Sequence, residues 1–186
     1  MLAVPNNEPQ TLGQQRHGRA RGWQFGVSFA LTATALLGLY YFPYPRGSVM
    51  QRVLAGYLHH YAWVSGSLLR LLEPNIIVSG QDILGRYSVR IVKTCDGMDV
   101  NILLFSAIMA WPCVVRRRVA AAAIGVAVLF VVNTSRICSL YLIGVYAPAS
   151  FELVHLELWP VLILIVAVIF FLLFIRDAEG RAAART

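Results

Sequence analysis

Three residues whose side chains together suit acyl transfer lie beside apolar segments of the chain. Cys95 lies in the polar stretch 94–98 before one apolar run, Arg136 lies near the end of another, and His155 lies in a short loop before the last. A thiolate is a nucleophile, a guanidinium can stabilise an oxyanion, and an imidazole can carry a proton near neutral pH. These three residues are the predicted catalytic set, and the chemistry they suit is acyl transfer through a thioester.

Two neighbours of Cys95 bear on its reactivity. Gly97 allows a close backbone approach or an unusual turn directly before an apolar helix. A helix N-terminus beside a cation lowers a thiol pKa. Asp96 acts in the opposite sense, because an adjacent carboxylate raises a thiol pKa unless it points away or is itself paired.

Supporting residues are predicted for the other two members as well. Asn133 lies three residues before Arg136, so on a helix both side chains share one face. An arginine in or near a bilayer is costly and usually faces the protein interior, where it serves function. Glu152 lies three residues before His155 and is placed to orient the imidazole ring.

The remaining thiols and imidazoles give no second site. Cys113 and Cys138 lie in or at the end of apolar runs and are interpreted as small buried hydrophobic residues. His59 and His60 are adjacent, so on a helix they point in different directions, and no spacing supports a zinc site with His155. We expect no metal and no cofactor, since nothing matches Walker, Rossmann or Gly-x-Ser-x-Gly motifs.

Composition indicates an integral membrane protein. Of 186 residues, 58% are hydrophobic and 13% are charged, and the mean hydropathy is +0.65. Soluble domains have about 45–50% apolar and about 25% charged residues. The net charge of +7 comes from small basic groups beside apolar runs, which is typical of topology signals. The lipid bilayer is therefore an expected partner, and nucleic acid is not.

The hydropathy pattern predicts an all-α membrane protein with about four transmembrane helices, an interfacial helix and a small extracytoplasmic strand-like hairpin. A single transmembrane domain covers residues 23–176, between a disordered cytoplasmic tail at 1–22 and a cytoplasmic tail at 177–186. The predicted spans are residues 24–42, 98–114, 119–138 and 158–175. An alternative interpretation of residues 33–35 is a signal-peptide cleavage site.

Between the first two spans, the pattern changes twice. Residues 47–72 are amphipathic, and we expect a helix on the membrane surface or packed against the bundle. Residues 76–92 form the predicted hairpin, with strands at 76–78 and 87–92 and a turn from Gly80 to Gly85. One open question is whether this hairpin adds an edge strand to an extended peptide; a proline at Val89 would test it.

Basic residues near the span ends predict the orientation. The arginines at 116–118 follow the second span, Arg176 ends the fourth, and further arginines precede the first. Because short cytoplasmic loops carry an excess of Lys and Arg, both termini are predicted to be cytoplasmic. Cys95, Arg136 and His155 then lie at the outer face.

These motifs resemble the exosortase/archaeosortase family, and most closely its short exosortase H-type subgroup. The matching residues are Cys95 with Gly97 at a helix start, Asn133 with Arg136 and Ile137 at a helix end, and the later His155. The resemblance covers the run from Cys95 to about Arg176. One departure is Asp96, where many relatives have a small or neutral polar residue.

The resemblance implies a cysteine transpeptidase or protease in a bacterial inner membrane, with its active site at the extracytoplasmic face. Its substrates would be membrane-anchored proteins with a C-terminal sorting signal, made of a short motif, a transmembrane helix and a basic tail. Cys95 would form a thioester, Arg136 would stabilise the oxyanion and His155 would manage the proton. The product would pass to a cell-envelope amine whose identity is unknown, or to water.

Two other classes remain open from the residues. One is a non-enzymatic assembly factor or transport subunit, in which Arg136 and His155 are structural. The other is thiol–disulfide exchange, or a structural bridge between Cys95 and Cys138, since both are predicted near the outer face.

Overall fold

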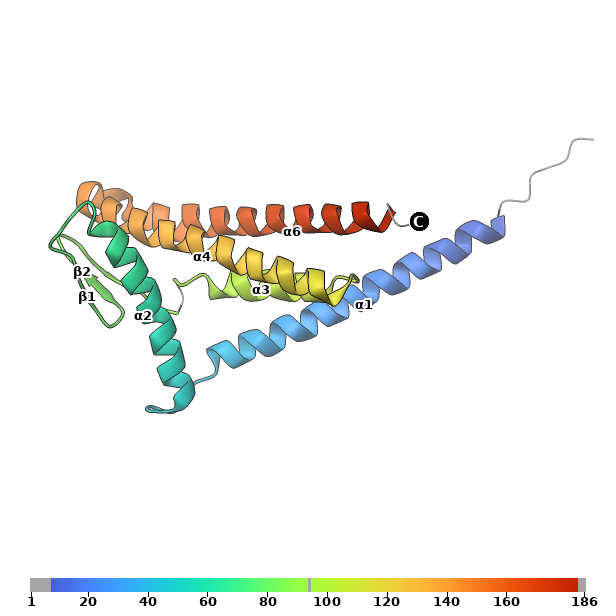
Figure 1. Ribbon diagram of the computed structural model, residues 1–186, viewed down its shortest axis with the longest axis horizontal. Helices are drawn as coiled ribbons and strands as arrows, with labels where there is room; N and C mark the ends of the chain where they lie inside the picture. The colour runs from blue at the N-terminus through green and yellow to red at the C-terminus, as the bar shows by residue number, and fades with distance from the viewer. Residues whose placement is uncertain (1–7, 94, 184–186) are drawn as a thin grey trace, which may run out of the picture.

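The computed structural model describes residues 8–93 and 95–183 and is almost entirely helical (Figure 1). The long helices are α1 (Glu8–Tyr41), α2 (Val49–Leu69), α4 (Val115–Tyr146) and α6 (Trp159–Ala183), with a shorter α3 (Met98–Ala110). Three short turns of helix, η1 (Pro148–Ser150), α5 (Phe151–Leu153) and η2 (Val154–Leu158), connect α4 to α6. The predicted all-α class is confirmed.

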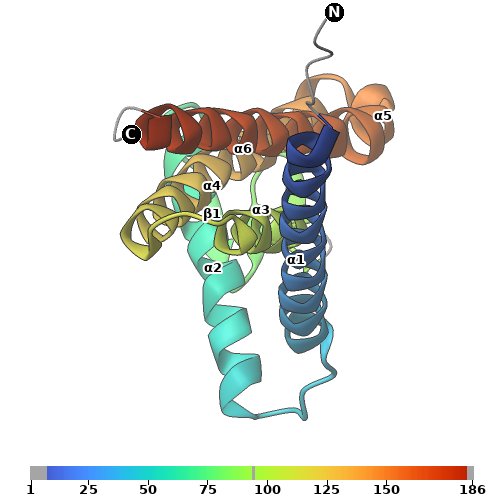
Figure 2. The same cartoon turned by 90° about the vertical axis from the view of Figure 1, so that its right-hand side faces the viewer.

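The helices α1, α3, α4 and α6 form a bundle, and α2 crosses it steeply at one end (Figure 1). In Figure 2, α3 lies between α1 and α4, with α6 above them, and α3 contacts all three. The amphipathic prediction for residues 47–72 corresponds to α2, which packs against α4 through its buried face. Ser48 caps α2, because its hydroxyl accepts a hydrogen bond from the Gln51 amide at 3.2 Å.

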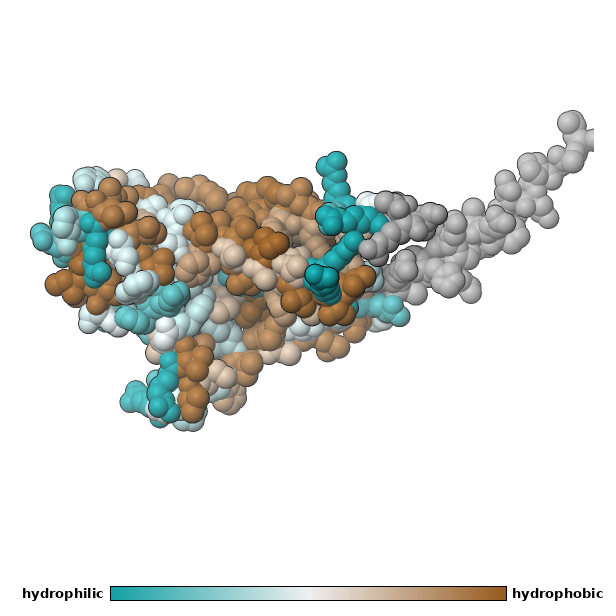
Figure 3. Space-filling model, in the orientation of Figure 1, coloured by the Kyte–Doolittle hydropathy of each residue, from teal (hydrophilic) through white to brown (hydrophobic). Residues whose placement is uncertain are grey.

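Within the described residues, three helical segments are long and apolar enough to cross a membrane, namely Gly22–Tyr41, Val115–Tyr146 and Pro148–Arg181. Many large apolar side chains of α6 are exposed in the isolated chain, as lipid contact requires. Figure 3 shows an apolar band over the bundle between polar patches toward its two ends. The protein is therefore a multi-pass membrane protein.

The second predicted span is shorter than expected. Its helix α3 has 13 residues, or about 20 Å at about 1.5 Å per residue, against a hydrocarbon core of about 30 Å. The prediction placed the end near residue 114, but Pro112 disfavours helical geometry at the residue before it. Trp111 is accordingly extended, with φ −70° and ψ 131°.

The predicted hairpin is a three-stranded antiparallel sheet of β1 (Ile77–Ser79), β2 (Asp82–Leu84) and β3 (Ser88–Arg90), in the order β1-β2-β3. The prediction that residues 80–85 form only a turn was wrong, because this stretch contains β2. Gly80, with φ 59°, and Gln81 make a two-residue turn, which brings Ser79 opposite Asp82. Ile83 of β2 is fully buried, and this burial favours a strand although the glycines on either side of it indicated a turn.

Two apolar clusters hold these elements together. One joins α2, the sheet and α4 around Tyr61, Ile83 and Tyr141, and the other joins α3, α4 and α6 around Ile108 and Leu129. The sheet is fixed to the first cluster, so the segment that leads to Cys95 is attached to the bundle.

Both predicted tails are partly outside the described residues, which exclude 1–7 and 184–186. Within the part that is described, α1 begins at Glu8 and α6 continues to Ala183. The segment predicted to be disordered thus includes the first turns of α1. Its Pro9 lies in the first turn, where a proline is tolerated.

Candidate active site

Cys95 and His155 meet at the end of the bundle that carries the sheet. The Cys95 Sγ atom lies 3.0 Å from His155 Nε2, and both side chains are half-buried. A backbone hydrogen bond of 2.9 Å from the Cys95 amide to the Val92 carbonyl turns the chain from the sheet toward α3. The distance is within reach of proton transfer between thiol and imidazole.

His155 lies in η2, a single π-helical turn at the start of the last helical segment. Such turns are rare and frequently occur at functional sites. The Phe151 ring, four residues earlier, packs against the imidazole with a centroid separation of 5.4 Å. Tyr87, which precedes β3, packs in turn on Phe151 at 5.6 Å. Two aromatic rings therefore position the histidine.

Arg136 links the two residues through their backbones. Its Nη1 donates to the Cys95 carbonyl at 3.4 Å and its Nη2 donates to the His155 carbonyl at 3.5 Å. The residue is only 6% exposed, and no carboxylate of the described chain forms an ion pair with it. A buried cation without an ion-pair partner in the described chain therefore lies beside the loop of Cys95.

Asn133 and Gly97 fit together as one unit behind the thiol. Asn133, 1% exposed, donates its amide to the Asp96 carbonyl at 2.7 Å. Gly97 has φ 70°, and a Cβ built there would lie 3.3 Å from the Asn133 amide oxygen. A left-handed residue without a side chain is therefore required where the loop enters α3.

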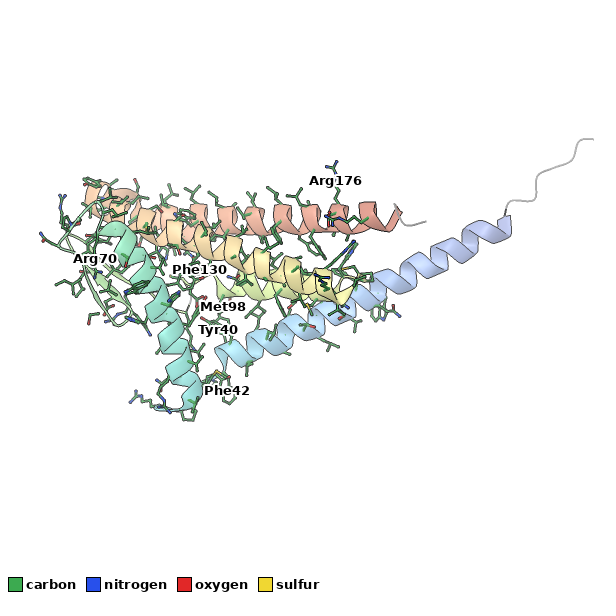
Figure 4. The ribbon with its side chains drawn as sticks, in the orientation of Figure 1. Tyr40, Phe42, Arg70, Met98, Phe130 and Arg176 are labelled. Carbon is green, nitrogen blue, oxygen red and sulfur yellow. The ribbon has the colours of Figure 1, made fainter. Side chains whose placement is uncertain are left out.

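The Asp96 carboxylate is itself paired with donors from α1 and the start of α3. The Tyr40 hydroxyl donates to Oδ2, and the Met98 amide donates to Oδ1 at 2.9 Å. Figure 4 shows Tyr40 and Met98 close together where the end of α1 meets the start of α3. Burial raises the pKa of Asp96 and is opposed by these hydrogen bonds. Asp96 therefore anchors the loop of Cys95 to α1.

Glu152 is the supporting residue that the structure does not bring to the site. Its side chain is exposed, and no hydrogen bond joins it to His155 within the described residues. Phe151 takes the neighbouring place instead. Its position four residues before His155 is a helical spacing that sequence reasoning overlooked. The contact of Tyr40 with Asp96 was also missed, because the two residues are 56 positions apart and nothing in the sequence near Tyr40 indicates it.

A small cavity of about 120 Å³ opens beside the three candidate residues. Its other walls are residues 87–91 of the sheet, Ile137 and Leu140 of α4, and Phe151. A strand and a membrane helix therefore both line this cavity.

The other thiols and imidazoles whose side chains the structure describes lie elsewhere. Cys138 contacts the Ser65 carbonyl at 3.7 Å, and Cys113 lies at the opposite end of the bundle, beside Trp111. His59 contacts the Gly80 carbonyl at 2.5 Å, and His60 stacks on Phe130. In the described part of the chain, no group of three or more His, Cys, Asp or Glu side chains could hold a metal ion.

Comparison with known proteins identifies the family. A model of the family described as transmembrane exosortase (Exosortase_EpsH) matches residues 20–176, and the chain belongs to this family. The match begins well before Cys95, so α1, α2 and the sheet are part of the family domain. No curated protein and no solved structure matches the chain. Family membership supports a membrane transpeptidase and protein-sorting role in general.

Proposed function

We propose that this exosortase is a membrane cysteine transpeptidase or protease with Cys95 as its nucleophile. The observation that carries the proposal is the 3.0 Å approach of the Cys95 thiol to His155 Nε2, beside the Arg136 guanidinium. These side chains come from three separate segments of the sequence. Convergence of a nucleophile, a base and a cation is the arrangement that acyl transfer requires.

In the first step, His155 Nε2 takes the proton of the Cys95 thiol, and Arg136 favours the resulting thiolate. The thiolate attacks the carbonyl carbon of the scissile peptide bond and forms a tetrahedral oxyanion. Arg136 stabilises this developing charge; such donors typically contribute about 10²–10³-fold in rate. Asn133 and Gly97 hold the loop so that the thiol stays beside His155.

In the second step, the carbon–nitrogen bond breaks, and the proton on His155 passes to the leaving amine. The acyl group remains on Cys95 as a thioester. An amine of the cell envelope, or water, then attacks the thioester carbonyl and gives a proton to His155. The carbon–sulfur bond breaks, the acyl group leaves with the new amine or hydroxyl, and the proton passes from His155 to the Cys95 sulfur, which restores the thiol. The identity of the acceptor decides between transpeptidation and hydrolysis.

The substrates that fit are exported membrane proteins with a short motif, a transmembrane helix and a basic tail at the C-terminus. The cut would fall just outside the bilayer, on the extracytoplasmic side of a bacterial inner membrane. Support comes from α4, where Arg117 and Arg136 are about 30 Å apart along the helix, which is about one bilayer core. The arginines at 116–118 and Arg176 lie at the end opposite the site, as the positive-inside rule expects for the cytoplasmic face (Figure 4).

The test uses a membrane protein from the same genome that carries such a C-terminal signal and a tag on its basic tail. It is co-expressed with the wild type, with Cys95→Ala, or with the matched control Cys113→Ala. We expect the wild type and Cys113→Ala to remove the tag, and Cys95→Ala to leave it in place. Equal removal by all three forms across several candidate substrates would overturn the proposal.

The orientation has its own test. In a Cys113→Ala, Cys138→Ala background, Cys95 is the remaining thiol and should react with a membrane-impermeant maleimide from the extracytoplasmic side. Labelling of Cys95 only after the reagent is given access to the cytoplasmic face would contradict the proposed orientation.

The non-enzymatic alternative predicts that Cys95→Ala preserves function, so the tag assay also decides that question. For the disulfide alternative, the Cys95 thiol lies against His155 whereas the Cys138 thiol lies against Ser65. The two sulfurs have different partners, and no disulfide joins them in the structure.

A further inference from the structure

The strand β3 has one edge that no other strand of the described chain pairs with. Its only strand partner is β2, whereas the strand at the other side of the sheet, β1, packs against α2. An unpaired strand edge presents backbone amides and carbonyls to any extended chain that reaches it. The chain leaves β3 at Arg90 and reaches Cys95 five positions later.

The register of the sheet shows which backbone groups face this edge. The Ile91 amide donates to the Gln81 carbonyl at 3.0 Å, and Val89 lies opposite Ile83. In an antiparallel pair, hydrogen-bonded and non-bonded positions alternate, so Val89 is bonded to β2 like Ile91. The amides and carbonyls of Ser88 and Arg90 therefore point away from β2, toward the free edge.

The free edge lies beside the reactive residues. Five consecutive residues from Tyr87 to Ile91 line the cavity that also contacts Cys95, Arg136 and His155. Successive side chains of a strand point to opposite faces. A cavity that touches all five residues thus extends along the strand and is not confined beneath one face.

The size of the cavity shows that most of a bound peptide must be held elsewhere. Its volume of about 120 Å³ is below the roughly 300–1,000 Å³ of typical ligand pockets. Only a small part of a polypeptide enters such a space, and the strand edge is the adjoining surface with backbone hydrogen-bonding groups.

The Arg90 side chain leaves this edge accessible. Its Nε and Nη2 donate to the two Asp82 oxygens on the neighbouring strand at 2.6 and 2.9 Å. The Arg90 hydrogen bond lowers the pKa of Asp82. The guanidinium is thereby directed across the outer face of the sheet, away from the free edge.

We propose that the substrate binds as an additional β-strand on the free edge of β3, with its scissile carbonyl brought to Cys95. This inference rests on the proposed function and specifies how its substrate is held. The occupant is the extended segment that precedes the substrate's transmembrane helix. Backbone hydrogen bonds to Ser88 and Arg90 supply binding that is independent of side chains, and the cavity selects the side chain next to the cut.

The matched variants for the test are Ser88→Pro and Ser88→Ala. Both remove the exposed hydroxyl, but only the proline removes the outward amide hydrogen. A proline at Val89 would instead break the pairing of β3 with β2. With the tagged substrate of the previous section, we expect Ser88→Pro to lower the rate of tag removal by about tenfold, as the loss of a hydrogen bond implies. Ser88→Ala keeps the backbone amide, so any loss that it shows measures the hydroxyl alone, and the loss in Ser88→Pro should exceed it by about tenfold.

A second measurement covers the case in which Ser88→Pro disturbs the sheet, as loss of Cys95 alkylation would reveal. Prolines are placed one at a time at successive substrate residues before the transmembrane helix and tested with the wild-type enzyme. A peptide strand on β3 uses the amide hydrogen of every second residue, so we expect loss of processing at alternate positions. Uniform tolerance, or sensitivity without a period of two, would overturn the edge proposal.

The controls separate this inference from the proposed function. Removal of the tag by Cys95→Ala would overturn the catalytic role itself. Processing that requires Cys95 but proceeds at the wild-type rate in Ser88→Pro, without alternation in the substrate scan, would overturn only the strand-addition mode.

Discussion

At the end of the bundle that carries Cys95, polar contacts join segments far apart in the sequence, whereas the opposite end is held by aromatic packing. Asn133 reaches the Asp96 carbonyl at 2.7 Å, and Cys95 reaches His155 at 3.0 Å. At the opposite end, Phe25 packs edge-on against Trp111 at 5.6 Å, and Trp111 packs against Phe171 at 6.1 Å.

This difference between the two ends shows where the fold fixes the positions of individual side-chain atoms. Apolar packing depends mainly on volume and tolerates exchange of side chains of similar size. A buried hydrogen-bond network depends on the position of each atom, and it loses stability when one partner is missing. Matched substitutions at the two ends should therefore differ most in their effect on activity.

The largest effect is expected for His155→Gln, because it removes the group that carries the proton. Tag removal should fall by about 10²–10⁴-fold, the usual contribution of general acid–base catalysis. In the same variant, the rate of Cys95 alkylation should no longer change with pH where the imidazole gains or loses its proton. The control is His60→Gln, because His60 stacks on Phe130 within the bundle. Activity within about tenfold of the wild type in His155→Gln would remove the histidine from the mechanism.

The next largest effect is expected for Arg136→Lys, compared with Arg118→Lys at the opposite end. Arg136 spans two carbonyls with one planar guanidinium, which an ammonium cannot reproduce. We expect tag removal to fall by about 10²–10³-fold. Arg118 also donates to a carbonyl, that of Met109 at 2.8 Å, but lies far from the thiol. Equal losses in both variants would point to a structural role for each arginine.

The sequence was most informative where a residue's chemistry and its place in the hydropathy pattern agreed. Cys95, Arg136 and His155 each lie near the boundary of a predicted span, and any fold that returns these boundaries to one face brings them close, although α4 itself continues past Arg136 to Tyr146. Their arrival at the same end of the bundle depends on which face each segment boundary reaches, and the hydropathy pattern predicts this.

Other features depend on tertiary contacts that leave no local signal. Ile83 forms part of a buried strand only because Tyr141 and α2 cover it, although its flanking glycines indicated a turn. The Tyr40–Asp96 contact joins α1 to the start of α3, and neither residue alone indicates the other as its partner. The end of α3 at Ala110 was predictable in principle, because Pro112 was visible in the sequence.

A smaller effect is expected for Gly97→Ala, compared with Gly125→Ala in the opposite half of the bundle. Gly97 has φ 70°, which costs an alanine about 1–2 kcal/mol, and its Cβ would press on Asn133. Because that loop carries Cys95, we expect a loss of about tenfold in tag removal. At Gly125 the new Cβ would lie 3.0 Å from Leu104 Cδ2 and Phe170 Cε1, side-chain ends that can shift.

The measurements for this pair are tag removal and thermal unfolding in detergent. Gly125→Ala should lower the unfolding temperature and leave tag removal near the wild-type rate. A loss of activity in Gly125→Ala as large as in Gly97→Ala would mean that packing at both ends controls the site equally.

The smallest effect on activity is expected for Tyr40→Phe, compared with Tyr41→Phe. The Tyr40 hydroxyl donates to the buried Asp96 carboxylate, whereas the Tyr41 hydroxyl donates to Asp99 at 2.8 Å in an exposed position. Water can replace the second donor but not the first, so Tyr40→Phe should cost about 1–3 kcal/mol in stability and Tyr41→Phe almost none.

The stability that Tyr40→Phe loses should also depend on pH. Burial raises the pKa of Asp96 in the folded protein above its ordinary value of about 3.9. A carboxyl with a raised folded pKa binds its proton more tightly when folded, so its ionisation lowers stability as pH rises through that pKa. Without the hydrogen bond from Tyr40, the folded protein with an ionised Asp96 is less stable still. The difference in unfolding temperature between wild type and Tyr40→Phe should therefore grow from acidic to neutral pH, and a difference independent of pH would mean that Asp96 stays protonated throughout.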